Sequence, residues 1–187
     1  MDYEDLLGIG IIGLGLMVIM GAILIALAIV YVLNSLVLMK VFKILDYEKP
    51  AYAWIPFYNA YILASEISDG LKNVHVLLVD IPVDVYKWLW LIVSVACSTV
   101  SNFIPYVGPL LSIAISVIYY GDLYARVYAL ITGNKVEDET GLGIASAFIH
   151  LIYYIRVLMH SIDGTERVKF RETDELIYRE VDNDFTK

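Results

Sequence analysis

Long apolar stretches separated by short polar ones dominate the pattern of this chain. The stretch from Leu6 to Met39 contains no charged residue, and three further apolar stretches follow it. About 20 apolar residues in a helix cross the roughly 30 Å core of a bilayer. The pattern therefore predicts an all-α integral membrane bundle with four transmembrane helices, at about 8–39, 86–102, 110–131 and 141–160.

The segment 51–68, between the first two predicted spans, mixes aromatic residues with a proline and an asparagine. Its characteristic residues are Trp54, Pro56, Tyr58 and Asn59. Because Trp and Tyr prefer the headgroup layer, this segment is predicted to be an interfacial or re-entrant helix. If it crosses the membrane fully, the chain has five spans instead of four. The lysine and arginine counts fit both arrangements equally, so the side on which the C-terminal tail lies stays open.

The polar segments divide the chain into one transmembrane domain and a tail. A connector at 69–85 has no predicted conformation, a turn at 103–109 contains two prolines and a glycine, and a polar loop lies at 132–140. Together with the spans, these segments make up a transmembrane helical domain at 1–160. Residues 161–187 form a tail with 5 basic and 8 acidic residues, which we expect to be solvated and partly disordered.

Composition and charge narrow the class of protein further. Hydrophobic residues make up 59% of the 187 residues and charged residues 18%, which is more apolar than soluble domains usually are. The net charge of −8 argues against a nucleic-acid partner, because phosphates require a positive field. The single cysteine, Cys97, excludes an intrachain disulfide and a multi-cysteine metal site. We therefore expect no cofactor or metal, and the lipid bilayer as the main partner.

A motif after the first predicted span resembles a known family. It consists of Lys49-Pro50, Trp54 and the run Ile55-Pro56-Phe57-Tyr58-Asn59. This pattern resembles a family of small bacterial multi-pass membrane proteins of unknown function, and the resemblance extends over roughly residues 35–160. It implies the family's fold and a multi-pass location in the bacterial inner membrane, and it implies no activity. The acidic loop near 137–139 and the polar residues of the last span depart from the family's pattern.

Polar residues recur at helical spacing in three of the predicted spans. The stripes contain Ser94, Ser98, Ser101 and Asn102 in the second span, Ser112, Ser116 and Tyr119 in the third, and Ser146, His150 and Tyr153 in the fourth. One interpretation is interhelical hydrogen bonding, worth about 0.6 kcal/mol per bond on average. The other is a polar path or small-ligand cavity in the bundle interior, and the pattern leaves both open.

Two features of the predicted spans carry ionisable groups. Asp122 and Arg126 are one helical turn apart and can form an ion pair on the same helix. A packed pair near the interface and a contact with an ion or a partner both remain open. His150 lies near the middle of the fourth predicted span, where an ionisable residue is costly and therefore a functional candidate. It is either a hydrogen-bonded neutral histidine or part of a proton relay or gate.

No catalytic constellation stands out in the sequence. The three histidines are far apart, no His-Glu-x-x-His occurs, and no basic residue near Cys97 lowers its pKa. We therefore expect a non-enzymatic protein, a subunit or scaffold of a membrane assembly with a membrane-protein partner or a second copy of itself. The alternative is a small oligomeric channel or transporter with a polar path through the second, third and fourth spans. An intramembrane enzyme is the third and least supported class.

Overall fold

The computed structural model of this protein describes residues 3–77, 79–104 and 106–162, with side chains from Gly13 onward. Helices account for most of these residues, in agreement with the predicted all-α class. Two described helices are long and apolar enough to cross a membrane, at Gly13–Ile44 and Val107–Thr132. The four-span bundle is therefore not confirmed. Residues 163–187 of the predicted tail lie outside the described residues.

The chain divides into two compact units, the first of which ends at Leu36. Within that unit the chain is a single helix, the beginning of α1 (Tyr3–Ile44). One helix has no core of its own, and large apolar side chains such as Met17 and Leu24 are exposed along it. The 32 residues Gly13–Ile44 make a helix of about 48 Å, longer than the core of a bilayer. The first predicted span is thus a helix that continues beyond its expected end at 39.

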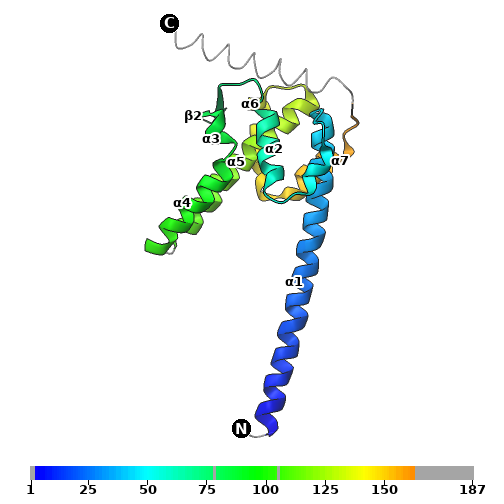
Figure 1. The fold of residues 1–187 in the computed structure, drawn as a ribbon, viewed down its shortest axis with the longest axis vertical. Coiled ribbons are helices and arrows are strands. Elements are labelled where there is room, and N and C mark those ends of the chain that lie inside the picture. Colours follow the sequence, from blue (N-terminus) through cyan, green and yellow to red (C-terminus); the bar gives the residue numbers. More distant parts are fainter. Residues whose placement is uncertain (1–2, 78, 105, 163–187) are drawn as a thin grey trace. The chain divides into compact units, whose positions relative to one another are not determined.

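The second unit begins at Val37 and contains the core of the protein. Its elements are the end of α1, η1 (Pro50–Trp54), α2 (Tyr58–Ile67), β1 (Asn73–Val76), β2 (Val79–Pro82), α3 (Val83–Tyr86), α4 (Leu89–Phe103), α5 (Val107–Thr132), α6 (Val136–Phe148) and α7 (His150–Met159). The largest buried side chains include Phe42, Tyr86, Leu123, Tyr128 and Tyr153, which come from α1, α3, α5 and α7. The second half of α5 therefore passes through the centre of this unit (Figure 1).

The predicted interfacial helix at 51–68 is interrupted. The helix η1 ends at Trp54, Ile55 is extended, and α2 begins at Tyr58. This break has a local cause, because a proline at 56 disfavours the helical conformation of the residue before it. Phe57 adopts a φ of 65°, in the left-handed region that non-glycine residues rarely occupy. Asn59 is buried and its Nδ2 donates to the carbonyl oxygen of Ala53 at 3.2 Å, which ties α2 to η1 across the break.

The connector at 69–85, for which the sequence predicted no conformation, forms a small antiparallel hairpin of β1 and β2. His75 pairs with Asp80 in the strand register, and His75 Nδ1 lies 2.8 Å from Asp80 Oδ1. The short helix α3 follows β2 directly and places Tyr86 in the core. These few strand residues are the only departure from helix among the described residues that form regular structure.

The predicted second and third spans form a helical hairpin of α4 and the first half of α5 (Figure 1). The helix α4 begins at Leu89, three residues later than expected, and its 15 residues extend about 22 Å. The two helices approach closely at Gly108, where an added Cβ would lie 2.7 Å from the carbonyl oxygen of Cys97. Apolar side chains are exposed on both helices of this hairpin, among them Val95 and Leu110.

The predicted fourth span at 141–160 is two helices instead of one. The helix α6 begins at Val136, inside the segment expected to be a loop, and three acidic residues occupy its first turn. Negative charges at that position stabilise a helix through its dipole, which accounts for the early start. The helix ends at Phe148, and Ile149 has non-helical angles (φ −120°, ψ 80°) before α7 begins. At about 20 Å and 15 Å, neither helix is long enough to cross a bilayer by itself.

Candidate functional site

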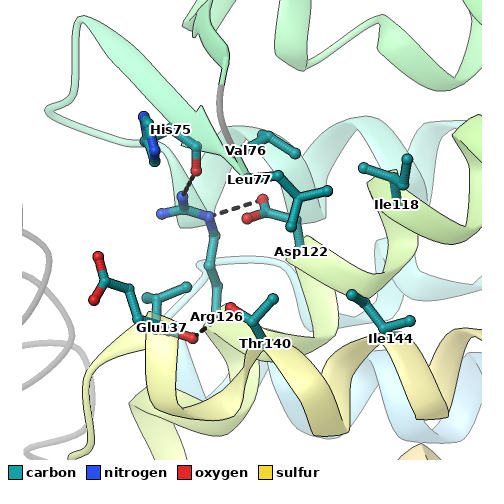
Figure 2. Close-up of a pocket in the computed structure, with 10 residues that line it drawn as sticks. His75, Val76, Leu77, Ile118, Asp122, Arg126, Glu137, Thr140 and Ile144 are labelled. Carbon is teal, nitrogen blue, oxygen red and sulfur yellow. Dashed lines mark hydrogen bonds and ion pairs between the residues drawn. The ribbon is translucent and has the colours of Figure 1, made fainter.

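A cavity of about 270 Å³ lies between the β1–β2 turn, α5 and α6 (Figure 2). Its apolar walls are contributed by Val76, Leu77, Ile118, Val136 and Ile144. Its polar lining consists of His75, Asp122, Arg126, Glu137 and Thr140. Three different elements therefore contribute to a single concave site, which is the usual character of a ligand pocket.

The structure pairs Asp122 with Arg126, as their spacing on one helix predicted. Arg126 Nε donates to Asp122 Oδ2 at 3.0 Å, and the two side chains are only 2% and 10% exposed. Arg126 Nη2 also donates to the backbone carbonyl oxygen of His75 at 3.1 Å (Figure 2). The guanidinium thus joins α5 to the β-hairpin. A buried charge of this kind requires a partner and further hydrogen bonds, and both are present here.

Tyr86 completes this cluster from α3, just before α4 begins. Its hydroxyl donates to Asp122 Oδ2 at 2.6 Å. Burial raises the pKa of the Tyr86 hydroxyl well above its usual value, and the negative charge of Asp122 raises the pKa further. Tyr86 therefore remains a protonated donor to the carboxylate. Sequence analysis missed this residue because its partner is 36 positions away in the chain.

A second polar cluster holds the turn between α5 and α6 and is centred on Glu139. This carboxylate accepts hydrogen bonds from Thr132 Oγ1 at 3.0 Å, Asn134 Nδ2 at 2.9 Å and Arg156 Nη2 at 3.1 Å. The guanidinium of Arg156 also lies over the ring of Tyr128, 4.4 Å from its centre. The acidic triplet at 137–139 was visible in the sequence, but only Glu139 is buried. The cluster fixes where α6 and α7 lie against α5.

The polar stripe predicted on the second span is located on α4. Ser94 Oγ donates to the carbonyl oxygen of Trp90, and Ser98 Oγ donates to that of Ser94, each at 2.7 Å. Both side chains are exposed, as is Asn102. The two serine hydroxyls thus use their donors within their own helix, as serines in apolar helices often do.

A small cavity of about 50 Å³ lies where α4 faces α5. Ser94 and Ser116 both line it, together with Trp90 and Tyr119, so the structure brings these two predicted residues together. Trp90 Nε1 and the Tyr119 hydroxyl are buried and have no hydrogen-bond partner among the described residues. A polar cavity of this size holds one or two water molecules. Ser112, the other predicted residue of α5, is half-buried and does not line this cavity.

The residues of the third predicted stripe are divided between α6 and α7. Ser146 Oγ lies 2.7 Å from the hydroxyl of Tyr128 in a buried hydrogen bond. The ring of Tyr153 stacks on that of Tyr124, with centroids 4.0 Å apart, and His150 meets Tyr124 edge-on. These contacts belong to the aromatic core around α5, whereas Ser98 and Asn102 of the α4 stripe are exposed. Neither cavity is lined by a member of this third stripe, and the proposed polar path stays a prediction.

The aromatic residues around Pro56 form an aromatic surface at the break between η1 and α2. The side chain of Phe57 is 72% exposed, and Trp54 and Tyr58 are also partly exposed. Phe57 stacks on Trp90 of α4 with ring centroids 5.9 Å apart, and Tyr61 meets Trp88 at 4.7 Å. Exposed Trp and Tyr rings are typical of residues at a membrane–water interface.

Within the described part of the chain, no group of three or more His, Cys, Asp or Glu side chains is arranged to hold a metal ion. Cys97 is buried on α4. Comparison of the chain with protein-family models, with curated proteins and with solved structures gives no match.

Proposed function

We propose that this protein is a non-enzymatic multi-pass membrane protein that acts as a subunit or scaffold of a membrane assembly. The observation that carries the proposal is the apolar surface of α1 up to Leu36, a part of the helix that forms a unit without a core of its own. A helix that is hydrophobic on all sides is stable only when lipid or another protein surrounds it. Its function therefore depends on what it contacts in the membrane.

The α4–α5 hairpin supports the same proposal from the second unit. Its exposed apolar residues include Leu91, Val95, Leu110 and Ile113, and no charged residue occurs from Trp88 to Gly121. The charged clusters of this unit lie outside the hairpin, in the folded core of the unit and at its surface. We propose that α1 and this hairpin enter the bilayer, while the aromatic surface around Phe57 lies at the headgroups. A bacterial inner membrane is the location that the family resemblance implies.

Cysteine labelling tests whether the hairpin is inserted. In a Cys97→Ala background, Tyr106→Cys places a thiol at the exposed hairpin turn, and Asp138→Cys places one on exposed α6. A membrane-impermeant maleimide should label position 138 when it is added to one of the two sides of intact membranes. It should label position 106 only after detergent is added. Equal labelling of both positions before detergent would show that the hairpin lies in water.

The composition of the native complex tests the assembly. Tagged protein extracted into lipid nanodiscs should carry a stoichiometric second membrane protein when its mass is measured. The face of α1 with small residues at Gly15, Ala22 and Ala26 is the expected contact, because small residues let helices approach closely. Ala22→Leu with Ala26→Leu should therefore release the partner, whereas Ala28→Leu on the opposite face should not. A single-chain species at every expression level would contradict the proposal.

A small oligomeric channel or transporter is the second candidate function. It is supported by the cavity of about 50 Å³ that Ser94 and Ser116 line, beside which two buried donors have no hydrogen-bond partner among the described residues. A cavity of this size within one chain holds too little water for a continuous path, so conduction would require several copies. Ion flux in proteoliposomes, lost in Ser98→Leu and in His150→Ala, would favour this function. Flux that survives both changes would exclude the predicted path.

A further inference from the structure

The cavity between the β-hairpin, α5 and α6 is lined by a carboxylate that has one oxygen without a hydrogen bond from the described residues. Asp122 Oδ2 accepts hydrogen bonds from both Tyr86 and Arg126. Asp122 Oδ1 accepts none from the described residues, and it is not among the polar atoms that are sealed from solvent without a partner. Asp122 itself is 91% buried and lines the cavity. Its free oxygen is therefore an acceptor presented to whatever occupies that space (Figure 2).

The charges around the cavity favour a positive occupant. Among the described residues of the lining, Asp122 and Glu137 are negative and Arg126 is the only positive side chain. His75 is paired with Asp80, and this pair carries no net positive charge in either protonation state of the histidine. The positive charge of Arg126 is already matched by Asp122 at 3.0 Å. The described residues of the lining therefore leave one negative charge over the site, and this charge would repel a bound anion.

The remainder of the lining is apolar. Leu77 and Ile118 are partly exposed at the cavity, and Ile144 lies on the facing side of α6 (Figure 2). A volume of about 270 Å³ corresponds to about nine water molecules at roughly 30 Å³ each. It is slightly smaller than the pockets of drug-sized ligands, which begin near 300 Å³. An occupant that uses the whole lining therefore needs a short apolar arm as well as a donor group.

We propose that this cavity binds a small organic cation, namely a primary ammonium group on a short apolar arm. The ammonium donates to Asp122 Oδ1 and lies in the field of Glu137, while the arm packs against Ile118 and Ile144. The ammonium can belong to a free amine or to the headgroup of an aminophospholipid, since the recognised chemistry is the same. This inference depends only on the cavity, so it stands or falls separately from the proposed assembly.

Equilibrium dialysis of the full chain in phosphatidylcholine nanodiscs tests the proposal, with empty nanodiscs as the blank for partition into lipid. The probes are phenethylammonium, neutral 2-phenylethanol and anionic phenylacetate, which share one apolar arm. A charge-assisted hydrogen bond is worth enough to separate ligands about tenfold or more in affinity. We expect one saturable site for phenethylammonium and at least tenfold weaker binding of the other two. Equal binding of all three, or stronger binding of phenylacetate, would overturn the proposal.

Matched variants locate the site. Ile118→Trp fills the cavity and should abolish saturable binding, whereas Ile113→Trp, also exposed on α5 but outside the cavity, should leave it unchanged. Glu137→Gln should weaken binding severalfold, and Asp138→Asn, the next residue along the helix and not part of the lining, should have a smaller effect. Because Glu137 is exposed, its variant keeps the test valid if Ile118→Trp does not fold. Binding that is unchanged in Ile118→Trp and in Glu137→Gln would place the probe elsewhere.

The lipid composition separates the two sources of the ammonium group. Replacing half of the phosphatidylcholine by phosphatidylethanolamine should displace phenethylammonium if the lipid headgroup is the natural occupant. Unchanged binding would identify a free amine as the ligand. Both results support recognition of an ammonium group, provided that the preference for phenethylammonium over 2-phenylethanol has been measured in phosphatidylcholine alone.

Discussion

Replacing Arg126 with methionine removes the positive member of a buried ion pair while keeping a long side chain in its place. Arg126 is 2% exposed and donates to Asp122 Oδ2 at 3.0 Å and to the carbonyl oxygen of His75 at 3.1 Å. In the variant, the carboxylate of Asp122 keeps only the hydrogen bond from Tyr86. The variant therefore leaves a buried negative charge without its counter-charge.

The expected cost follows from burial of the remaining charge. Removing one partner of a buried pair typically costs about 3–5 kcal/mol, because the charge left behind is no longer compensated. For a chain of this size, about 1 kcal/mol corresponds to roughly 2–4 °C in melting temperature. Arg126→Met should therefore lower the melting temperature by about 6–20 °C. Adding Asp122→Asn to this variant should recover most of the loss, since the uncompensated charge is then gone.

Thermal unfolding of the protein in one detergent, followed by tryptophan fluorescence, measures these differences. Asp80→Asn provides the control, because Asp80 belongs to the neighbouring pair with His75 but its side chain is 55% exposed. Exposed pairs contribute about 0–1 kcal/mol, so this variant should melt within about 4 °C of the native protein. A loss in Arg126→Met no larger than that of Asp80→Asn would refute the buried pair. The same conclusion would follow if Asp122→Asn worsened the loss instead of relieving it.

Three further predictions concern packing and hydrogen bonds of the second unit. Gly143→Ala should destabilise the protein by at least about 1–3 kcal/mol, because the added Cβ would clash with the backbone of α5. At Gly141 an added Cβ meets nothing within 4 Å, so Gly141→Ala should be neutral or stabilising when both variants are melted in detergent. Tyr128→Phe and Ser146→Ala each leave one buried hydroxyl of a 2.7 Å hydrogen bond unpaired, so each should cost about 1–3 kcal/mol, and the double variant should cost less than the sum in the same melts. Burial keeps the pKa of Tyr86 in the folded protein above its unfolded value of about 10, so the stability of the protein should fall as the pH rises above 10. In a series of thermal melts at increasing pH, Tyr86→Phe should make this fall shallower.

The apolar stretches predicted the positions of α1, α4 and α5 because each of these helices is a long run of mainly apolar residues, whether it is exposed, as most of α4 is, or buried, as the second half of α5 is. Their helical state follows from local composition, whatever they later pack against. The same reasoning failed after Thr132. The acidic first turn stabilises a start of α6 at Val136, earlier than predicted. The helical conformation is interrupted at Ile149, where the sequence has no proline or glycine that would predict a turn. Beyond this break, Tyr153 of α7 stacks on Tyr124 of α5, and such a contact between separate helices has no signature in the sequence.

The candidate site was predictable only in the part that lies on one helix. Asp122 and Arg126 are four residues apart on α5, so their pairing follows from helical geometry. The other members arrive from segments that the sequence could not place. The carbonyl oxygen of His75 depends on the β-hairpin, and the Tyr86 hydroxyl depends on the short helix α3. The free oxygen of Asp122 becomes apparent only when both of its neighbours are known.

The distribution of charge also distinguishes the helical hairpin from the core of the second unit. No charged residue lies between Lys87 and Asp122, a range that contains all of α4 and the first half of α5. The ion pair begins where α5 enters the core, and there the protein itself supplies the partners that each charge needs. A charged side chain at the bilayer centre costs about 2.5–3.5 kcal/mol even when it can reach toward the surface. The uncharged range is thus the part of the hairpin that lipid can surround at little cost, and Lys87 and Asp122 mark the limits beyond which the chain needs water or its own core.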